Sequence, residues 1–107
     1  MPVQTIDPET MQQAAAEASR LMKTLANPDR LLILCELSGG ERCVSELEAA
    51  LGILQPTLSQ QLSVLREEAL VDTRREGRQI YYSVRSPRAL AVLKVLYQQF
   101  CGGGKNR

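Results

Sequence analysis

The sequence of 107 residues contains no histidine and no Cys-x-x-Cys pair. It also has no glycine-rich loop opening a helix and no carboxylate pair that we expect to share a cleft. General acid–base catalysis, phosphate binding and thiol oxidoreduction normally need at least one of these features. The sequence therefore predicts a protein that is not an enzyme and that needs no cofactor or metal.

No apolar run is long enough to span a membrane, and the N-terminus lacks the basic and apolar regions of a signal peptide. We therefore expect a cytoplasmic protein. In that reducing compartment a cysteine pair that oxidises is more often a sensor than an inert structural disulfide. The length favours a single domain over residues 1–107 with a flexible tail at each end, the second being the glycine-rich stretch 102–107.

Charge is nearly balanced overall but unevenly distributed. The net charge is only +1, which is low for a protein that binds nucleic acid. Residues 1–53 hold four basic and eight acidic side chains, whereas residues 54–107 hold nine basic and four acidic ones. The second half is therefore positive, and it also contains the elements that could contact DNA.

A helix with a small polar face is predicted to begin near residue 55. Its apolar positions follow at steps of three and four and form one stripe: Leu58, Leu62, Leu65 and Ala69. Short donors and acceptors lie elsewhere on the helix, and we take as candidate base-reading residues Gln55, Thr57, Ser59, Gln60 and Ser63. Gln pairs with adenine, and Ser or Thr pairs with several bases. A solvated helix face would have the same composition, so the neighbouring elements decide between the two interpretations.

Those neighbours complete a winged helix-turn-helix. A short helix over residues 45–51 is expected to end at Gly52, followed by a tight turn. Two strands over 71–75 and 79–84 are predicted to pair through Gly77, with Val71, Ile80, Tyr82 and Val84 facing the core. Three candidate phosphate-binding cations surround the hairpin tip, namely Arg74, Arg75 and Arg78. We expect a mostly α-helical fold of about five helices with a two-stranded wing.

The flanking segments predict a dimer. Apolar residues recur at helical spacing from near Pro8 to Leu25, and again from about Pro87 to Phe100. A central helix over residues 28–38, capped by Asn27, is apolar nearly all round and is expected to be buried. Two such flanking helices have more apolar surface than a small domain readily covers. Packing against a second copy would cover it, and closing the monomer core is the alternative.

Four segments resemble the successive signatures of ArsR/SmtB-type bacterial repressors: Leu25–Leu31, Ser45–Leu47, Leu58–Arg66 and Arg74–Tyr82. The resemblance extends from about Ala15 to Cys101. It implies a homodimer that joins through its first and last helices, binds double-stranded operator DNA and represses an operon until an inducer binds. The sequence departs from the family pattern at Leu54, where many relatives have a capping Ser or Thr, and at Ala69, where Gly is usual.

The positions of the three cysteines indicate which class of inducer the protein senses. We call the helix predicted to begin near residue 55 the reading helix. Metal sensors of the family carry Cys-Val-Cys at the start of the helix that precedes the reading helix, or Asp and His ligands along the last helix. Here the first pattern is reduced to Cys43-Val44-Ser45, and the second is impossible without histidine. Cys35 and Cys101 instead resemble the pair of the persulfide-sensing branch, the SqrR, BigR and HlyU-like repressors. In that branch reduced thiols permit DNA binding, and reactive sulfur species weaken it by linking them through a disulfide or polysulfide.

Alternatives remain open from the sequence alone. Cys35 could be a buried structural residue, and Cys43 could be incidental or could react by itself at a helix N-terminus. Peroxide, or a thiophilic metal or metalloid such as arsenite, could be the signal in place of a persulfide. A winged helix that binds only proteins is a further alternative, which salt-dependent binding to promoter DNA would distinguish.

Overall fold

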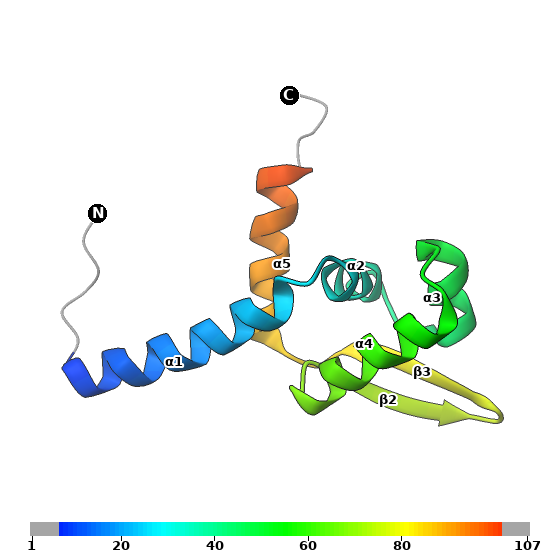
Figure 1. The fold of residues 1–107 in the computed structure, drawn as a ribbon, viewed down its shortest axis with the longest axis horizontal. Helices are drawn as coiled ribbons and strands as arrows, with labels where there is room; N and C mark the ends of the chain where they lie inside the picture. Colours follow the sequence, from blue (N-terminus) through cyan, green and yellow to red (C-terminus); the bar gives the residue numbers. More distant parts are fainter. Residues whose placement is uncertain (1–6, 102–107) are drawn as a thin grey trace.

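A computed structural model describes residues 7–101, which form five helices and a small antiparallel sheet (Figure 1). In chain order the elements are α1 (Pro8–Leu25), α2 (Pro28–Leu37), β1 (Arg42–Cys43), α3 (Val44–Leu51), α4 (Gln55–Glu67), β2 (Val71–Glu76), β3 (Gln79–Val84) and α5 (Pro87–Phe100). The predicted winged helix-turn-helix is confirmed, with α3 and α4 as its two helices. Both predicted tails lie outside the described residues. No helix within residues 7–101 has the length and apolar composition needed to cross a membrane.

Helix ends follow the local sequence. Asp7, Asn27 and Ser86 each accept a hydrogen bond from a backbone N–H in the first turn of α1, α2 and α5, and each is followed by a proline at the first helical position. Gly52 ends α3 in the left-handed conformation, with φ of 72°. The reading helix α4 begins after Leu54, whose side chain makes no capping hydrogen bond, as its apolar character implies.

The sheet contains one strand more than the sequence indicated. Its order is β1-β3-β2, and all neighbours are antiparallel. The two-residue strand β1 pairs Arg42 with Tyr82 and Cys43 with Tyr81. Two residues are too few to give a detectable alternation of polar and apolar side chains, so this strand has no clear signature in the sequence. The hairpin turns at Gly77, which has a φ of 62° as expected.

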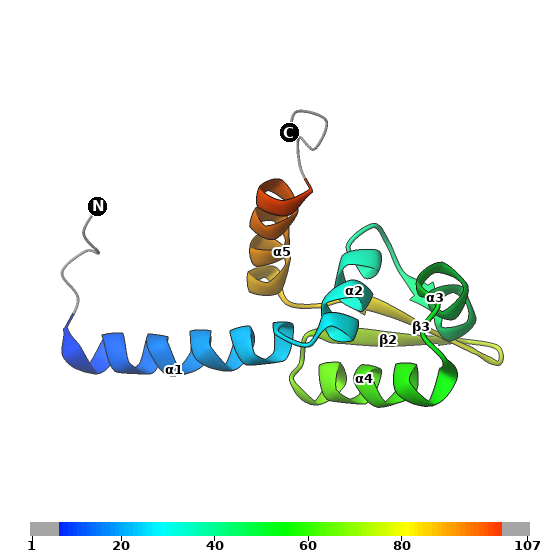
Figure 2. The same cartoon turned by 45° about the horizontal axis from the view of Figure 1, so that its top comes forward.

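The hydrophobic core lies between α2, α3, α4 and the sheet, with contributions from the ends of α1 and α5. Its largest fully buried side chains are Ile33, Leu34, Leu47, Leu58, Leu62 and Leu65. In two views α1 extends away from this core as an arm, and α5 stands apart from the wing (Figures 1 and 2). The reading helix and the hairpin are therefore held by a core to which most of α1 contributes nothing.

Three expectations about burial were wrong. The helix α2 is not buried all round, because Leu32 is 48% exposed and Cys35 is also exposed. Ile80 does not face the core and is 39% exposed, since it lies near the open tip of the hairpin. Ala69 does not continue the apolar stripe of α4. That helix ends at Glu67, and Ala69 is exposed with a φ of 60°. A left-handed conformation costs alanine about 1–2 kcal/mol, a cost that glycine would avoid because it has no Cβ.

Candidate DNA interface and dithiol site

The reading helix α4 has one buried face and one polar face. Leu58, Leu62 and Leu65 are at most 1% exposed and hold the helix against the core. All five predicted base-reading residues are exposed: Gln55, Thr57, Ser59, Gln60 and Ser63. The Ser59 hydroxyl donates a hydrogen bond to the side-chain oxygen of Gln55 within the same helix. The polar face therefore presents short donors and acceptors to solvent, in a form that suits base edges in a major groove.

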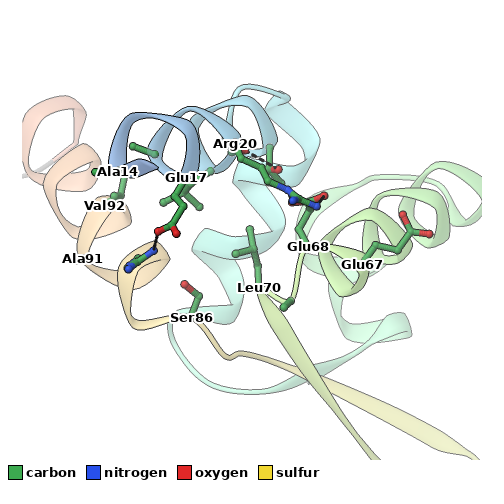
Figure 3. Close-up of a pocket in the computed structure, with 14 residues that line it drawn as sticks. Ala14, Glu17, Arg20, Glu67, Glu68, Leu70, Ser86, Ala91 and Val92 are labelled. Carbon is green, nitrogen blue, oxygen red and sulfur yellow. Dashed lines mark hydrogen bonds and ion pairs between the residues drawn. The ribbon is translucent and has the colours of Figure 1, made fainter. Parts of the chain in front are cut away.

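Two arginines outside the reading helix hold it in place. The Arg30 side chain donates from Nε to the Thr24 carbonyl at 2.8 Å and from a terminal nitrogen to Oε1 of Gln61 at 2.9 Å. Arg20 reaches from α1 to Glu68, just after α4, with two hydrogen bonds of 2.7 and 3.2 Å (Figure 3). This contact lowers the pKa of the Glu68 carboxyl. Neither link can be predicted from local sequence patterns, because the partners lie 31 and 48 positions apart.

The three candidate cations of the wing have different surroundings. Arg74 forms ion pairs with Glu41 and Glu76 and lies 4.8 Å above the Tyr81 ring. Arg75 donates to the carbonyl of Gly77 at 3.3 Å. Arg78 is exposed and forms no ion pair among residues 7–101. Arg74 therefore braces the hairpin, while Arg78 carries the charge most available to a phosphate.

The predicted dithiol pair, Cys35 and Cys101, lies near the C-terminal ends of α2 and α5. Cys35 and Cys101 are both exposed. Cys35 lines a pocket together with Tyr97, and the backbone N–H of Cys101 donates to the Tyr97 carbonyl one turn earlier at 2.7 Å. Partial burial raises the pKa of the Cys35 thiol, and the proximity of Cys101 raises it further. Cys101, 66 positions after Cys35 in the sequence, therefore lies one turn beyond a residue that shares a pocket with Cys35.

Cys43 is in a different environment. It is only 4% exposed and precedes the first turn of α3. Its backbone N–H donates to the Glu46 carboxylate at 3.0 Å, and its sulfur lies 3.2 Å from the Ser45 hydroxyl. This thiol is thus enclosed, whereas Cys35 and Cys101 are open to solvent.

A groove of about 760 Å³ separates α1 from α5 and from the turn between α4 and β2 (Figure 3). Small apolar side chains line it, including Ala14, Ala18 and Ala91. Two ion pairs cross it, one between Arg88 and Glu17 at 3.0 Å and one between Arg20 and Glu68 at 2.7 Å. Every residue from Pro8 to Arg20 is exposed, so this part of α1 packs against little in the isolated chain.

An exposed polar reading helix, the preceding helix and turn, and an arginine-tipped hairpin define a winged helix-turn-helix DNA-binding protein. Residues 27–73 match the family described as "Bacterial regulatory protein, arsR family". The chain is 51% identical over 96 residues to the biofilm growth-associated repressor of Agrobacterium fabrum, and the match covers 90% of this chain and 82% of that protein. The chain belongs to the arsR family, and it is a transcriptional repressor of that family, not an enzyme.

Solved structures agree with this assignment. The crystal structure of the repressor BigR from Xylella fastidiosa has a TM-score of 0.83 and 47% identity, and the match covers 90% of this chain and 98% of BigR. Reduced HlyU from Vibrio cholerae has a TM-score of 0.83 and 38% identity, with coverage of 87% and 98%. The resemblance to the branch of the family that contains BigR and HlyU is therefore confirmed.

Proposed function

We propose that this protein is a dithiol-based repressor that binds operator DNA as a homodimer while Cys35 and Cys101 are reduced. Reactive sulfur species link the two thiols and release the protein from DNA. The observation that carries the proposal is that Cys35 and Cys101 are both exposed, and that Cys101 lies one turn beyond Tyr97, which lines the same pocket as Cys35. Because its target is bacterial operator DNA, the protein acts in the cytoplasm.

The DNA contacts follow from the exposed polar face of α4 and from the wing. Gln60 and its neighbours Gln55, Thr57, Ser59 and Ser63 are proposed to contact base edges, and Arg75 and Arg78 to contact phosphates. We propose a secondary role for Arg74, because its guanidinium already pairs with two carboxylates. In a dimer, two reading helices would contact half-sites about one helical turn apart, or a multiple of that distance.

The exposed arm of α1 and the α1–α5 groove support the dimer. Met22 is 59% exposed and Val95 is 53% exposed, so both flanking helices present apolar side chains to solvent. A second copy would bury these surfaces in a symmetric interface. Because α5 also carries Cys101, a link to Cys35 would act on the helix that builds this interface and could change the spacing of the reading helices.

Mass spectrometry and operator binding, measured on the same samples, test the proposal. A persulfide donor should add an intramolecular link between Cys35 and Cys101 and weaken operator binding by about 5- to 150-fold, and a reductant should reverse both changes. Cys35→Ser and Cys101→Ser should stay bound to DNA under the donor. Cys43→Ser is the matched control and should respond as the wild type does. A response lost only in Cys43→Ser would overturn the assignment of the sensing pair.

Response to a thiophilic metal or metalloid is the second candidate function. Arsenite prefers two or three thiolates. Within residues 7–101 no three His, Cys, Asp or Glu side chains converge, so a single chain offers arsenite at most the two thiols of Cys35 and Cys101. Arsenite added to the reduced protein should leave operator affinity unchanged. Release by arsenite at stoichiometric concentration, without a Cys35–Cys101 link, would favour this second function.

A further inference from the structure

A second pocket, of about 640 Å³, lies between α2 and α5 and opens beside Cys35. We call it the α2–α5 pocket. Its walls are mainly apolar and come from three helices: Leu32 from α2, Leu51 from α3, and Leu90, Leu93 and Tyr97 from α5. Its volume falls within the range of about 300–1,000 Å³ that is usual for small-molecule sites. An inorganic sulfur species would fill only a small part of it.

The polar groups of the α2–α5 pocket differ in their availability. Glu36 pairs with Arg42 at 3.5 Å. The Ser38 hydroxyl donates to the Cys35 carbonyl at 2.6 Å. Lys94 is exposed, and its ammonium group forms no ion pair among residues 7–101. The pocket therefore combines an apolar wall, an available positive charge and a thiol, which together complement an apolar anion that carries reactive sulfur.

We propose that the α2–α5 pocket binds the organic part of a persulfide, R–S–SH, in which R is an alkyl chain that ends in a carboxylate. The alkyl chain packs against Leu32 and Leu90, the carboxylate pairs with Lys94, and the sulfur atoms reach Cys35. This proposal rests on the dithiol function proposed above and names its class of inducer. The pocket thereby selects among sulfur donors by their organic group, before any covalent step.

The covalent steps balance with the persulfide as the oxidant. The Cys35 thiolate attacks the terminal sulfur of R–S–SH, and R–S⁻ leaves and takes up a proton to give R–SH. Cys35 then carries a persulfide, Cys35–S–SH. The Cys101 thiolate attacks the Cys35 sulfur and expels HS⁻, which closes the disulfide. One persulfide is thus reduced to R–SH and H₂S while two thiols are oxidised.

Reaction rates with two donors test the proposal. On the wild-type protein, the persulfide of mercaptohexanoate should form the Cys35–Cys101 link about tenfold faster than the inorganic donor, hydrogen disulfide (HS–SH), does. The reason is that the alkyl chain of the organic donor occupies the pocket. Lys94→Gln should reduce the rate with the organic donor about five- to tenfold by removing the ion pair. Leu32→Trp should reduce it at least about tenfold by filling the pocket. Both variants should keep the rate with the inorganic donor within about twofold.

Two control variants match these changes outside the pocket. Lys23→Gln removes an exposed charge from α1, and Leu54→Trp enlarges a side chain that is 72% exposed. Neither residue lines the pocket, so both variants should retain the preference for the organic donor. If Lys94→Gln and Leu32→Trp slow both donors equally, or if the wild type shows no preference, the proposed pocket function is wrong.

Binding of sulfur-free carboxylates separates this proposal from the dithiol chemistry. Hexanoate, heptanoate and octanoate should shift NMR signals of Leu32 and Leu90 in the reduced protein, with affinity rising about two- to fourfold per added methylene. If neither donor links the cysteines but these carboxylates bind with that trend, the dithiol function fails and the pocket stands. If the carboxylates do not bind, the pocket proposal is overturned whatever the cysteines do.

Discussion

The segment from Pro28 to Val84 and the two helices that flank it differ in how they bury their apolar residues. The central segment supplies most of the core, including all six of the largest fully buried side chains. Among the described residues, the flanking helices carry six of the nine large apolar side chains that are exposed, including Met22, Val95 and Phe100. The central segment thus supplies most of the core beneath the reading helix, whereas α1 and α5 present apolar surface for a partner.

The largest effect should come from opening the core beneath the reading helix. Leu62→Ala removes a side chain that is 1% exposed and should lower the free energy of unfolding by about 2–5 kcal/mol. Leu54→Ala is the matched control beside the same helix, because Leu54 is 72% exposed and should cost no more than about 0.5 kcal/mol. Urea denaturation of both variants measures the difference. Equal losses would show that the core described here is not what holds α4.

Removal of the α1 arm should affect dimerisation far more than folding. Among the described residues, a chain that begins at Arg20 loses only exposed ones, so its central segment should stay folded and melt within a few degrees of the wild type. It should be monomeric in analytical ultracentrifugation and bind the full operator at least about 100-fold more weakly, because the two half-sites are no longer engaged together. Glu17→Gln removes only an exposed ion pair with Arg88 and should remain dimeric. A truncated chain that stays dimeric would contradict the role of the arm.

Substitutions of the proposed base-contacting residues of α4 and of the proposed phosphate-contacting arginines of the wing should have different effects on DNA binding. Gln60→Ala should relax sequence preference by about 1–3 kcal/mol at one base position. Arg78→Ala should weaken all sequences similarly and flatten the dependence of affinity on salt. Arg74→Ala should change the salt dependence less, because Glu41 and Glu76 already neutralise that charge. Binding to operator and scrambled DNA at several salt concentrations distinguishes these outcomes, and equal loss of specificity from Gln60 and Arg78 would refute the assignment.

Local patterns in the sequence were enough to predict the five helices, the turn at Gly52 and the hairpin at Gly77. Each depends on residues within one or two turns of one another, as the caps at Asn27 and Ser86 illustrate. Contacts between distant residues could not be predicted in this way. Arg20 contacts Glu68 over 48 positions, and Arg74 contacts Glu41 over 33 positions. No local spacing in the sequence predicts either pair.

The candidate site shows the same limit. The polar face of α4 was predicted from helical periodicity, and its five named residues are exposed. The pairing of Cys35 with Cys101 came from resemblance to a family, because periodicity alone would have buried Cys35 in an apolar helix. The exposed side of α2 and the pocket beside it depend on how α5 packs, which the sequence of α2 does not contain. The roles of the α4 residues in DNA binding and of Cys35 and Cys101 in sensing stay predictions.

The reactivity of Cys35 should depend on pH. Partial burial and the nearby Cys101 raise the pKa of the Cys35 thiol, so the thiol is mostly protonated near neutral pH. Because the thiolate is the nucleophile, its alkylation rate should rise about tenfold per pH unit and should still be rising at about pH 8.5. Peptide mapping after timed alkylation gives this rate for each cysteine. A rate that levels off below about pH 8 would contradict the raised pKa.

Coupling between the dithiol and the reading helix can be measured as the reduction potential of the Cys35–Cys101 pair with and without operator DNA. If linking the thiols weakens DNA binding about 5- to 150-fold, then by linkage bound DNA must favour the reduced pair by the same factor. For a two-electron couple this factor corresponds to a rise in potential of about 20–65 mV. We predict that rise with operator DNA and a much smaller one with scrambled DNA of equal length. An unchanged potential would contradict the coupling between the dithiol and the reading helix.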